Sequence, residues 1–169
     1  MKKRESEIKL NLGCGHDHHF GYMNIDCREE CKPDRVFNIE DGGLGFLKDN
    51  SVDEVRAFDF LEHIALGRTV FVIEEIYRVL RPAGYFEHFT PSTDGRGAFQ
   101  DPTHKSFWNI NSWLYYTSTA RELYGIKALF GIIKLEDRET NEQLSEMLFF
   151  GPVIHTYGLM YAMKGAESE

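Results

Sequence analysis

The sequence predicts a single α/β domain with a mostly parallel sheet and helices on its faces. The chain has 169 residues, the size of one ordinary globular domain. Hydrophobic residues make up 42% and charged residues 27% of it, which is typical of a folded, water-exposed domain. Short strand-like apolar stretches also alternate with stretches whose apolar residues fall at helical spacing. That alternation is typical of βα units around a parallel sheet.

Four strands are expected in the first third of the chain. They are residues 8–12, 22–27, 35–39 and 53–58. Only nine residues separate Leu12 from Tyr22. A parallel crossover usually needs at least about ten to twelve. We therefore expect the first crossover helix to be missing or reduced to a turn.

The next elements follow from helical spacing and from breakers. Val70, Ile73, Ile76 and Leu80 lie on one helical face, so we expect a helix over 67–80 that stops before Pro82. The later expected elements are a strand at 85–90, a loop at 91–108, a helix at 111–123 and strands at 126–135 and 153–163. Residues 140–148 are expected to form a short helix or a loop. The domain then spans 8–164, with frayed ends at 1–7 and 165–169.

Composition narrows the functional class. Nineteen Lys and Arg against 27 Asp and Glu give a net charge of −8, which disfavours nucleic acid and anionic membranes as partners. No apolar run approaches the ~20 residues of a membrane-spanning helix, and the N-terminus lacks the apolar core of a signal peptide. Three cysteines, Cys14, Cys27 and Cys31, indicate a reducing, cytoplasmic setting rather than a disulfide framework.

A glycine turn and an acid mark a candidate nucleoside site. The segment LNLGCG is a strand that enters a G-x-G turn at Gly13 and Gly15, where the backbone can approach a ligand closely. Asp26 ends the next strand, where a carboxylate can accept both hydroxyls of a ribose. His18 stands where a dinucleotide site would have its third glycine, so pyrophosphate binding is disfavoured. A plain tight turn is the alternative interpretation.

Taken together, four segments resemble the class I S-adenosylmethionine-dependent methyltransferases. They are KLNLGCG, GYMNID, DNSVDEVRAFDFLEHI and EEIYRVLRPAGYFEHFTP, and the resemblance covers residues 8–108. The chain is most similar to a small subgroup with an LEH element after the fourth strand and a DPTH element after the fifth. The resemblance implies a single-domain Rossmann-like sheet of seven strands, the last antiparallel. The cofactor would lie over the carboxyl ends of the first strands.

The resemblance also assigns roles to residues. Gly13, Cys14 and Gly15 would wrap the methionine end of S-adenosylmethionine, and Asp26 would bind its ribose. Asn38 and Ile39 would face the adenine, with Asp41 as the alternative to Asn38. The other residues assigned to the cofactor are Phe58, Asp59 and Phe60 at the end of the fourth strand and His63, which follows Glu62 in the LEH element.

The 91–108 loop is the candidate acceptor side. Asp101 and His104 are three residues apart, and a histidine oriented by a carboxylate is a natural general base near neutral pH. We assign these two residues to catalysis. Alternatively, Asp101 caps a turn and His104 bonds to the backbone. Asp94, Lys105 and Trp108 of the same loop are assigned to acceptor binding.

Other histidines and aromatics have plainer interpretations. We expect His88 to lie in the core and His16, His18 and His19 to lie in a surface loop, with no resident metal ion. A divalent ion held by His88, Asp101 and His104 is a minor alternative. Trp113 and Tyr116 are expected in the core, and one of the adjacent Tyr115 and Tyr116 at a rim.

The predicted function is S-adenosylmethionine-dependent methyl transfer to an oxygen or nitrogen of an unidentified acceptor by in-line displacement. The acceptor would be a small molecule or an exposed surface group. The protein would act alone, as a homodimer or with a partner subunit. Two alternatives belong to other classes. One is a non-catalytic module that binds S-adenosylmethionine or a partner, and the other is a nicotinamide-dependent oxidoreductase.

Overall fold

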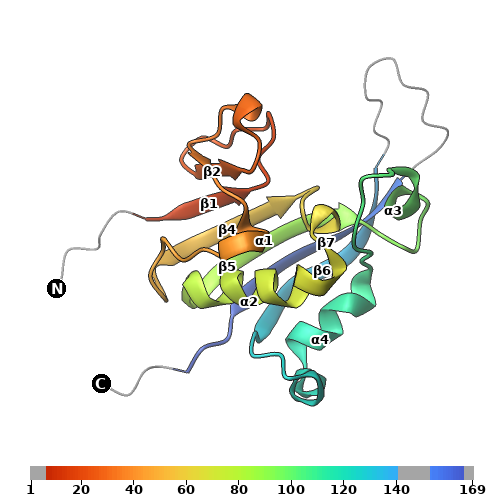
Figure 1. Ribbon diagram of the computed structural model, residues 1–169. Helices are drawn as coiled ribbons and strands as arrows, with labels where there is room; N and C mark the ends of the chain where they lie inside the picture. Colours follow the sequence, from red (N-terminus) through yellow and green to blue (C-terminus); the bar gives the residue numbers. More distant parts are fainter. Residues whose placement is uncertain (1–6, 141–152, 166–169) are drawn as a thin grey trace.

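The computed structural model describes residues 7–140 and 153–165. They form a seven-stranded sheet in the order β3-β2-β1-β4-β5-β7-β6 (Figure 1). The strands are β1 (Lys9–Leu12), β2 (Met23–Asp26), β3 (Arg35–Val36), β4 (Val52–Phe58), β5 (Leu80–Pro91), β6 (Phe130–Thr140) and β7 (Val153–Ala162). Neighbours among β1 to β5 pair in parallel, and β7 is antiparallel to both β5 and β6. The predicted mostly parallel α/β sheet with an antiparallel last strand is confirmed.

Three strands differ clearly from their predicted bounds, and one of them is β6, which spans Phe130–Thr140 instead of 126–135. β3 stops at Val36 instead of residue 39, because Asn38 leaves the sheet to cap α1 (Ile39–Gly42), its side chain accepting from the Glu40 amide. β5 starts at Leu80 instead of residue 85. Leu80 pairs with Val52, and the residues before Tyr85 form an irregularity in the ladder. The Pro82–Gly84 breakers therefore kink a continuous strand instead of preceding it.

The helices are short apart from one. They are α1, α2 (Thr69–Val79), α3 (Gly97–Gln100) and α4 (Leu114–Thr117), with 3-10 turns η1 (Glu29–Cys31), η2 (Leu61–His63), η3 (Leu66–Arg68), η4 (Ile110–Trp113) and η5 (Thr119–Tyr124). The helix predicted over 67–80 is confirmed as η3 and α2. The predicted 111–123 helix is broken, because Ser118 is extended and caps η5. Between β1 and β2 there are only turns, as the short crossover predicted.

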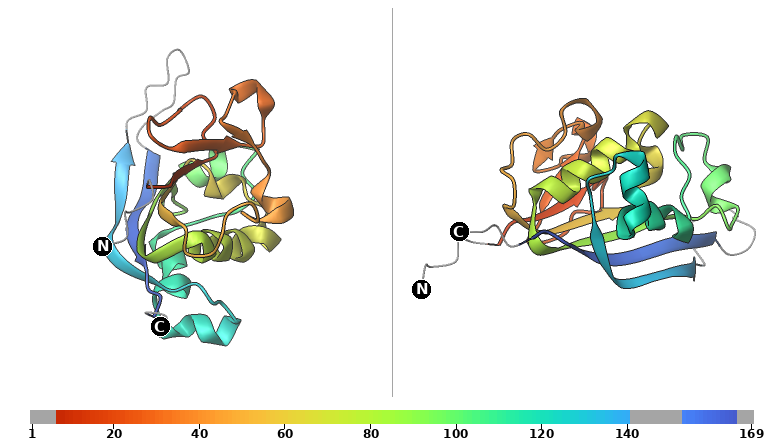
Figure 2. Two further views of the ribbon diagram at one scale, coloured as in Figure 1. Left: turned by 90° about the vertical axis from the view of Figure 1, so that its left-hand side faces the viewer. Right: turned by 90° about the horizontal axis from the view of Figure 1, so that it is seen from below.

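The described helices cover one face of the sheet, not both as predicted. Figure 2 shows α2 and α4 packed on the same side. Val55 and Ala57 of β4 pair with Phe86 and His88 of β5, and all four side chains are buried on this covered face. The core is therefore an interface between one sheet face and one helical layer.

The opposite face of the sheet carries polar and aromatic side chains that bond to one another. Lys9 lies 3.3 Å from Glu54 on the adjacent strand, and the Arg56 guanidinium lies 3.7 Å from the centre of the Phe58 ring. Charged pairs across neighbouring strands stabilise a solvated sheet face. The first crossover helix is missing, and the side chains on the face it would have covered are suited to contact with water.

Several predictions about single side chains can now be compared with the structure. His88 is fully buried and stacks on Trp113 with ring centroids 3.8 Å apart, so its core placement is confirmed. Tyr116 is buried and Tyr115 is 44% exposed, as expected for adjacent residues on a helix. Thr140 ends β6, and the rest of the 140–148 segment lies outside the described residues, as do most of the predicted frayed ends.

No helix in the described part of the chain has the length and apolar character needed to cross a membrane.

Candidate active site

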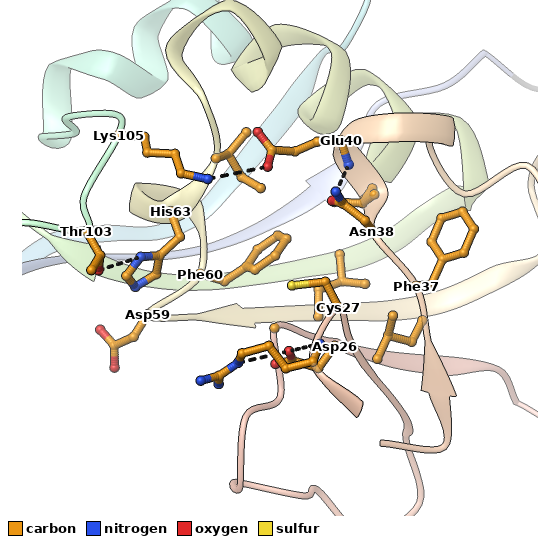
Figure 3. Close-up of a pocket in the computed structure, with 16 residues that line it drawn as sticks. Asp26, Cys27, Phe37, Asn38, Glu40, Asp59, Phe60, His63, Thr103 and Lys105 are labelled. Carbon is orange, nitrogen blue, oxygen red and sulfur yellow. Dashed lines mark hydrogen bonds and ion pairs between the residues drawn. The ribbon is translucent and has the colours of Figure 1, made fainter. Parts of the chain in front are cut away.

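A pocket of about 400 Å³ opens at the carboxyl ends of β1, β2 and β4 (Figure 3). In an open α/β sheet this edge is where ligands bind. Of the residues assigned to the cofactor, Gly13, Asp26, Asn38, Ile39, Asp59, Phe60 and His63 line it. The structure thus brings together residues from four separate turns.

The turn after β1 requires glycine for two different reasons. Gly13 has a φ of +64°, and a Cβ there would lie 2.3 Å from Cδ2 of Phe60. Gly15 has a φ of +49°, and its amide donates a 2.8 Å hydrogen bond to Oδ2 of Asp26. The glycines therefore let the turn pass close to the pocket wall and tie β1 to the end of β2.

Asp26 is held by backbone donors. Besides Gly15, the Arg28 amide donates to Oδ1 at 2.9 Å, and the Arg28 guanidinium lies 3.4 Å from the same oxygen. Burial acts to raise the pKa of Asp26, but these amides and the guanidinium outweigh it and hold the pKa below its usual value. A fixed, ionised carboxylate thus faces the pocket, as binding of ribose hydroxyls requires.

Ile39 and Asn38 line the opposite side of the pocket, beside the ring of Phe37. The Asn38 carboxamide accepts from the Glu40 amide at 3.1 Å and donates to Asp41 at 2.9 Å. Asp41 is not among the lining residues. The structure therefore places Asn38, and not its alternative Asp41, at the pocket wall.

Three residues assigned to the cofactor do not line the pocket. The Phe58 ring packs on Phe89 and Arg56, because strand alternation turns it to the uncovered face of the sheet. Cys14 is buried, with its amide bonded to the carbonyl of Ile25 at 3.1 Å. Gly15 acts through its bond to Asp26. The Phe58 ring therefore points away from this pocket, and the roles assigned to Cys14 and Gly15 at the methionine end stay predictions.

The part of the pocket that is the candidate acceptor side lies where residues 101–106 cross η2. The amides of Lys105 and Ser106 donate to the Glu62 carbonyl at 2.8 and 3.0 Å, and the Ser106 hydroxyl donates to the Leu61 carbonyl at 2.8 Å. Lys105 lines the pocket, with its Nζ 3.8 Å from a Glu40 oxygen. The loop is thus fastened to the LEH element through backbone bonds.

Two other residues assigned to acceptor binding lie elsewhere. Trp108 is buried, where it stacks on Trp113 and donates from Nε1 to Ser106. Asp94 is exposed and is not a lining residue of the pocket. Neither Trp108 nor Asp94 lines this pocket, and their assignment to acceptor binding stays a prediction. Alternation along the extended 103–108 segment turns Thr103 and Lys105 toward the pocket and Trp108 toward the core.

Asp101 and His104 lie near each other, as predicted, but not within hydrogen-bond distance. Nε2 of His104 lies 3.9 Å from Oδ2 of Asp101, which is longer than a hydrogen bond. The alternative contacts are also present. Asp101 caps a turn by accepting from the amide and hydroxyl of Thr103, both at 2.7 Å, and His104 Nδ1 bonds to the Ala98 carbonyl at 2.8 Å. His104 is mostly buried and lies behind His63, which lines the pocket.

Glu62 and His63 are perturbed by burial. Burial raises the pKa of the Glu62 carboxyl to about 8, and the nearby Asp59 carboxylate adds to the effect. Burial, followed by the neighbouring His104, lowers the pKa of His63. Both groups therefore favour their neutral forms near pH 7, and perturbed groups of this kind gather at functional sites.

Some lining residues were missed by the sequence analysis. Thr103 lies inside the DPTH element itself, and Glu40 lies two residues after Asn38, so spacing alone could have included them. Arg28 and Phe37 carried no such signal. Their presence depends on how η1 and α1 fold back over the ends of the strands.

The residues present fit a nucleoside with an apolar body and a cationic centre. The pocket has the volume of a small-ligand site and is mainly apolar, with Asp26, Asp59 and Glu40 supplying carboxylates. Phe60 and His63 add ring faces, which attract a cation such as a sulfonium. The fold and the site thus define a nucleoside-binding α/β domain suited to S-adenosylmethionine.

Comparison with known proteins matches part of the chain to a methyltransferase domain. The sequence model of the methyltransferase domain matches residues 20–87, which include Asp26, Asn38 and the LEH element. The match indicates an S-adenosylmethionine-dependent methyltransferase domain, and S-adenosylmethionine is the cosubstrate of such methyltransferases. No curated protein matches it.

Solved structures share the fold. A methyltransferase from Archaeoglobus fulgidus has a TM-score of 0.64 at 15% identity over 92% of this chain and 86% of its own. A methyltransferase from Haloferax volcanii, in complex with the Trm112 activator, has 0.62 at 13% identity over 99% and 87%. An adenine(1408)-N1 methyltransferase of 16S rRNA from Catenulisporales acidiphilia, with cosubstrate, has 0.59 at 12% identity over 96% and 88%.

Proposed function

We propose that this methyltransferase transfers a methyl group to an oxygen or nitrogen of an acceptor bound between the LEH element and the 101–106 segment. The observation that carries the proposal is the backbone clamp between Glu62 and Lys105–Ser106, which places His63, Thr103 and Lys105 on the wall beside the cofactor residues Asp59 and Phe60. Bound S-adenosylmethionine supplies an electrophilic methyl group.

Different residues of this chain are proposed to hold the ribose, position the turn and stabilise the sulfonium. Asp26 holds the ribose, and Gly13, with Gly15 behind it, keeps the turn close to the ligand. Phe60 and Asp59 lie near the end of β4, where a ring face and a carboxylate would stabilise a sulfonium. Proximity and alignment supply most of the rate in an in-line displacement, so the rigid clamp matters more than any single charge.

His104 is proposed to activate the acceptor, oriented by the Ala98 carbonyl, with the Asp101 carboxylate near Nε2 to stabilise the imidazolium that forms when the proton is taken. Nδ1 of His104 donates its hydrogen to the Ala98 carbonyl. Nε2 therefore keeps a lone pair, which faces Asp101 and the neighbouring His63. A buried, oriented imidazole is suited to receive a proton from a hydroxyl or an amine, directly or through His63.

A partner is part of the proposal. The face of the sheet that lacks helices and the exposed aromatic residues Phe107, Tyr115 and Tyr124 leave room for a second subunit (Figure 2). The Haloferax volcanii structure shows a protein of the same fold bound to an activator. We expect a homodimer or a complex with a partner subunit, which size-exclusion chromatography with light scattering measures.

The test measures turnover with labelled S-adenosylmethionine and separate sets of small molecules that carry a hydroxyl, an amine or a carboxylate as the acceptor group. We expect S-adenosylhomocysteine to form in an acceptor-dependent way. His104→Ala should lower turnover by about 10²–10⁴-fold, the usual contribution of a general acid or base. Full turnover by His104→Ala would remove this histidine from the mechanism.

A further inference from the structure

Three side chains behind the acceptor wall have the chemistry of metal ligands. Each of Glu62, His63 and His104 offers one ligating atom, and these atoms all lie within 4.8 Å of one another. Ligands at roughly 2.0–2.2 Å from a common ion must themselves lie within about 4.4 Å of one another, so only small side-chain movements are needed. In the described part of the chain this is the cluster that meets such a criterion.

The hydrogen bonds around the two histidines fix their protonation. The Ala98 carbonyl accepts from Nδ1 of His104 at 2.8 Å, so that nitrogen carries the hydrogen. The Thr103 hydroxyl donates its one hydrogen to Asp101 at 2.7 Å and therefore accepts from Nδ1 of His63, which lies 3.4 Å away. Both rings then keep the lone pair on Nε2.

Backbone carbonyl and carboxylate partners of this kind are what orient histidines that ligate metal ions. The Asp101–Thr103–His63 chain and the Ala98–His104 bond come from one loop, and the clamp to the Glu62 carbonyl holds that loop against η2. Hydrogen bonds to residues other than the three proposed ligands therefore hold the ligand side chains in place.

The local charge also favours a cation. Glu62 is buried near the carboxylates of Asp59 and Asp101, and a bound ion would replace the proton on its carboxyl group. Lys105 points to the other side of the pocket wall, toward Glu40 (Figure 3). Two imidazoles and one carboxylate form a ligand set that suits zinc, iron and related divalent ions.

We propose that Glu62, His63 and His104 bind one divalent transition-metal ion at the acceptor side of the pocket. The proposal rests on the proposed function and deepens it. The ion would occupy the Nε2 lone pair of His104, so the activation assigned to this histidine would pass to the ion, which would lower the pKa of an acceptor hydroxyl or amine bound to it so that the proton leaves to solvent. His63 lines the pocket, so an ion held there would have open positions toward an oxygen or nitrogen of the acceptor. The histidine-rich loop at 16–19 is a separate, exposed segment.

The test uses tag-free protein freed of metal by chelation and titrated with Zn²⁺ and, as a spectroscopic probe, with Co²⁺. We expect one ion per chain and visible Co²⁺ bands of a low-coordinate site. His63→Ala and His104→Ala should each weaken binding at least about 100-fold. Thr103→Val should weaken it roughly 10–100-fold, the usual effect of losing an orienting partner. His16→Ala is the matched control and should bind normally.

The outcomes separate this proposal from the proposed function. Unchanged metal binding in His63→Ala and His104→Ala, or binding lost only in His16→Ala, would overturn the metal site. S-adenosylmethionine titrations of the same samples serve as the folding control and as the test of the cofactor site. Intact cosubstrate binding without metal binding would overturn the metal proposal alone, whereas metal binding without cosubstrate binding would overturn the proposed function.

Discussion

The two sides of the pocket are built in different ways. The cofactor side is made by backbone: two glycines with positive φ, and a carboxylate held by the amides of Gly15 and Arg28. The acceptor side is made by side chains from η2 and from residues 101–105, which are about forty positions apart and joined by the clamp at Glu62. A turn geometry is a local property of the sequence, whereas a clamp depends on the whole sheet.

The largest expected effect breaks the cofactor side. Gly13→Ala places a Cβ 2.3 Å from Phe60 in a left-handed conformation that costs a non-glycine residue roughly 1–2 kcal/mol by itself. With the clash, we expect about 3 kcal/mol, or roughly 100-fold weaker S-adenosylmethionine binding by calorimetry. Gly125→Ala is the control, because Gly125 also has a positive φ but has open space around it. Equal effects of the two substitutions would contradict this account.

His88 lies in the core, on neither side of the pocket, and its burial predicts how the free energy of unfolding depends on pH. Burial lowers the pKa of His88 to about 3, below the value near 6.5 expected when the chain unfolds. The unfolded state therefore binds the proton first, so stability is lost as pH falls from 6.5 toward 3. At pH 5 the loss is on the order of 2 kcal/mol relative to pH 8.

Urea unfolding at pH 8 and pH 5 measures this loss, and His88→Leu should remove that part of the difference. The acceptor-side histidines leave the His88 contribution unchanged. A difference between the two pH values that is the same in wild type and in His88→Leu would show that His88 is not buried as a neutral ring.

The clamp can be weakened without touching the cofactor side. The buried Ser106 hydroxyl donates to the Leu61 carbonyl and accepts from Trp108 Nε1. Ser106→Ala leaves both partners without it, and we expect a loss of about 1–2 kcal/mol in the free energy of unfolding. S-adenosylmethionine affinity should stay within about twofold. A parallel loss of affinity would mean that the two sides are not separable.

The smallest effect concerns a charge beside the cofactor. The Arg28 guanidinium is largely exposed and 3.4 Å from Asp26, whereas the Arg28 amide makes the shorter bond. Exposed ion pairs contribute roughly 0–1 kcal/mol. Arg28→Ala should therefore weaken cosubstrate binding less than about threefold in the same titration. A tenfold loss would show that the side chain, not the backbone, holds Asp26.

The sequence predicted the cofactor side well, because its signals are local. A strand that ends in GCG and a strand that ends in Asp26 specify a turn and a carboxylate without knowledge of distant contacts. The sequence did not predict the direction of the Phe58 side chain, because that direction depends on which face of the sheet is covered. The short crossover predicts that a helix is missing, but it does not predict which side chains line the uncovered face. The positions of Trp108 and Asp94 could not be predicted from the sequence, because the path of the 91–108 segment is set by its bonds to η2.

The acceptor side was predicted in part. The DPTH spacing brought Asp101 and His104 together, yet the role of Thr103 between Asp101 and His63 needs the loop to fold over the LEH element. Neither motif alone indicates that Glu62 and His104 lie together. The grouping arises from two backbone amides that donate to one carbonyl.

The most direct measurement is a calorimetric titration of S-adenosylmethionine and S-adenosylhomocysteine into wild type, Asp26→Ala and His104→Ala, with NAD as the negative ligand. We predict binding of the first two ligands, its loss in Asp26→Ala and its retention within about threefold in His104→Ala. NAD should not bind. Binding unaffected by Asp26→Ala, or lost in a folded His104→Ala, would contradict a pocket with separate cofactor and acceptor sides.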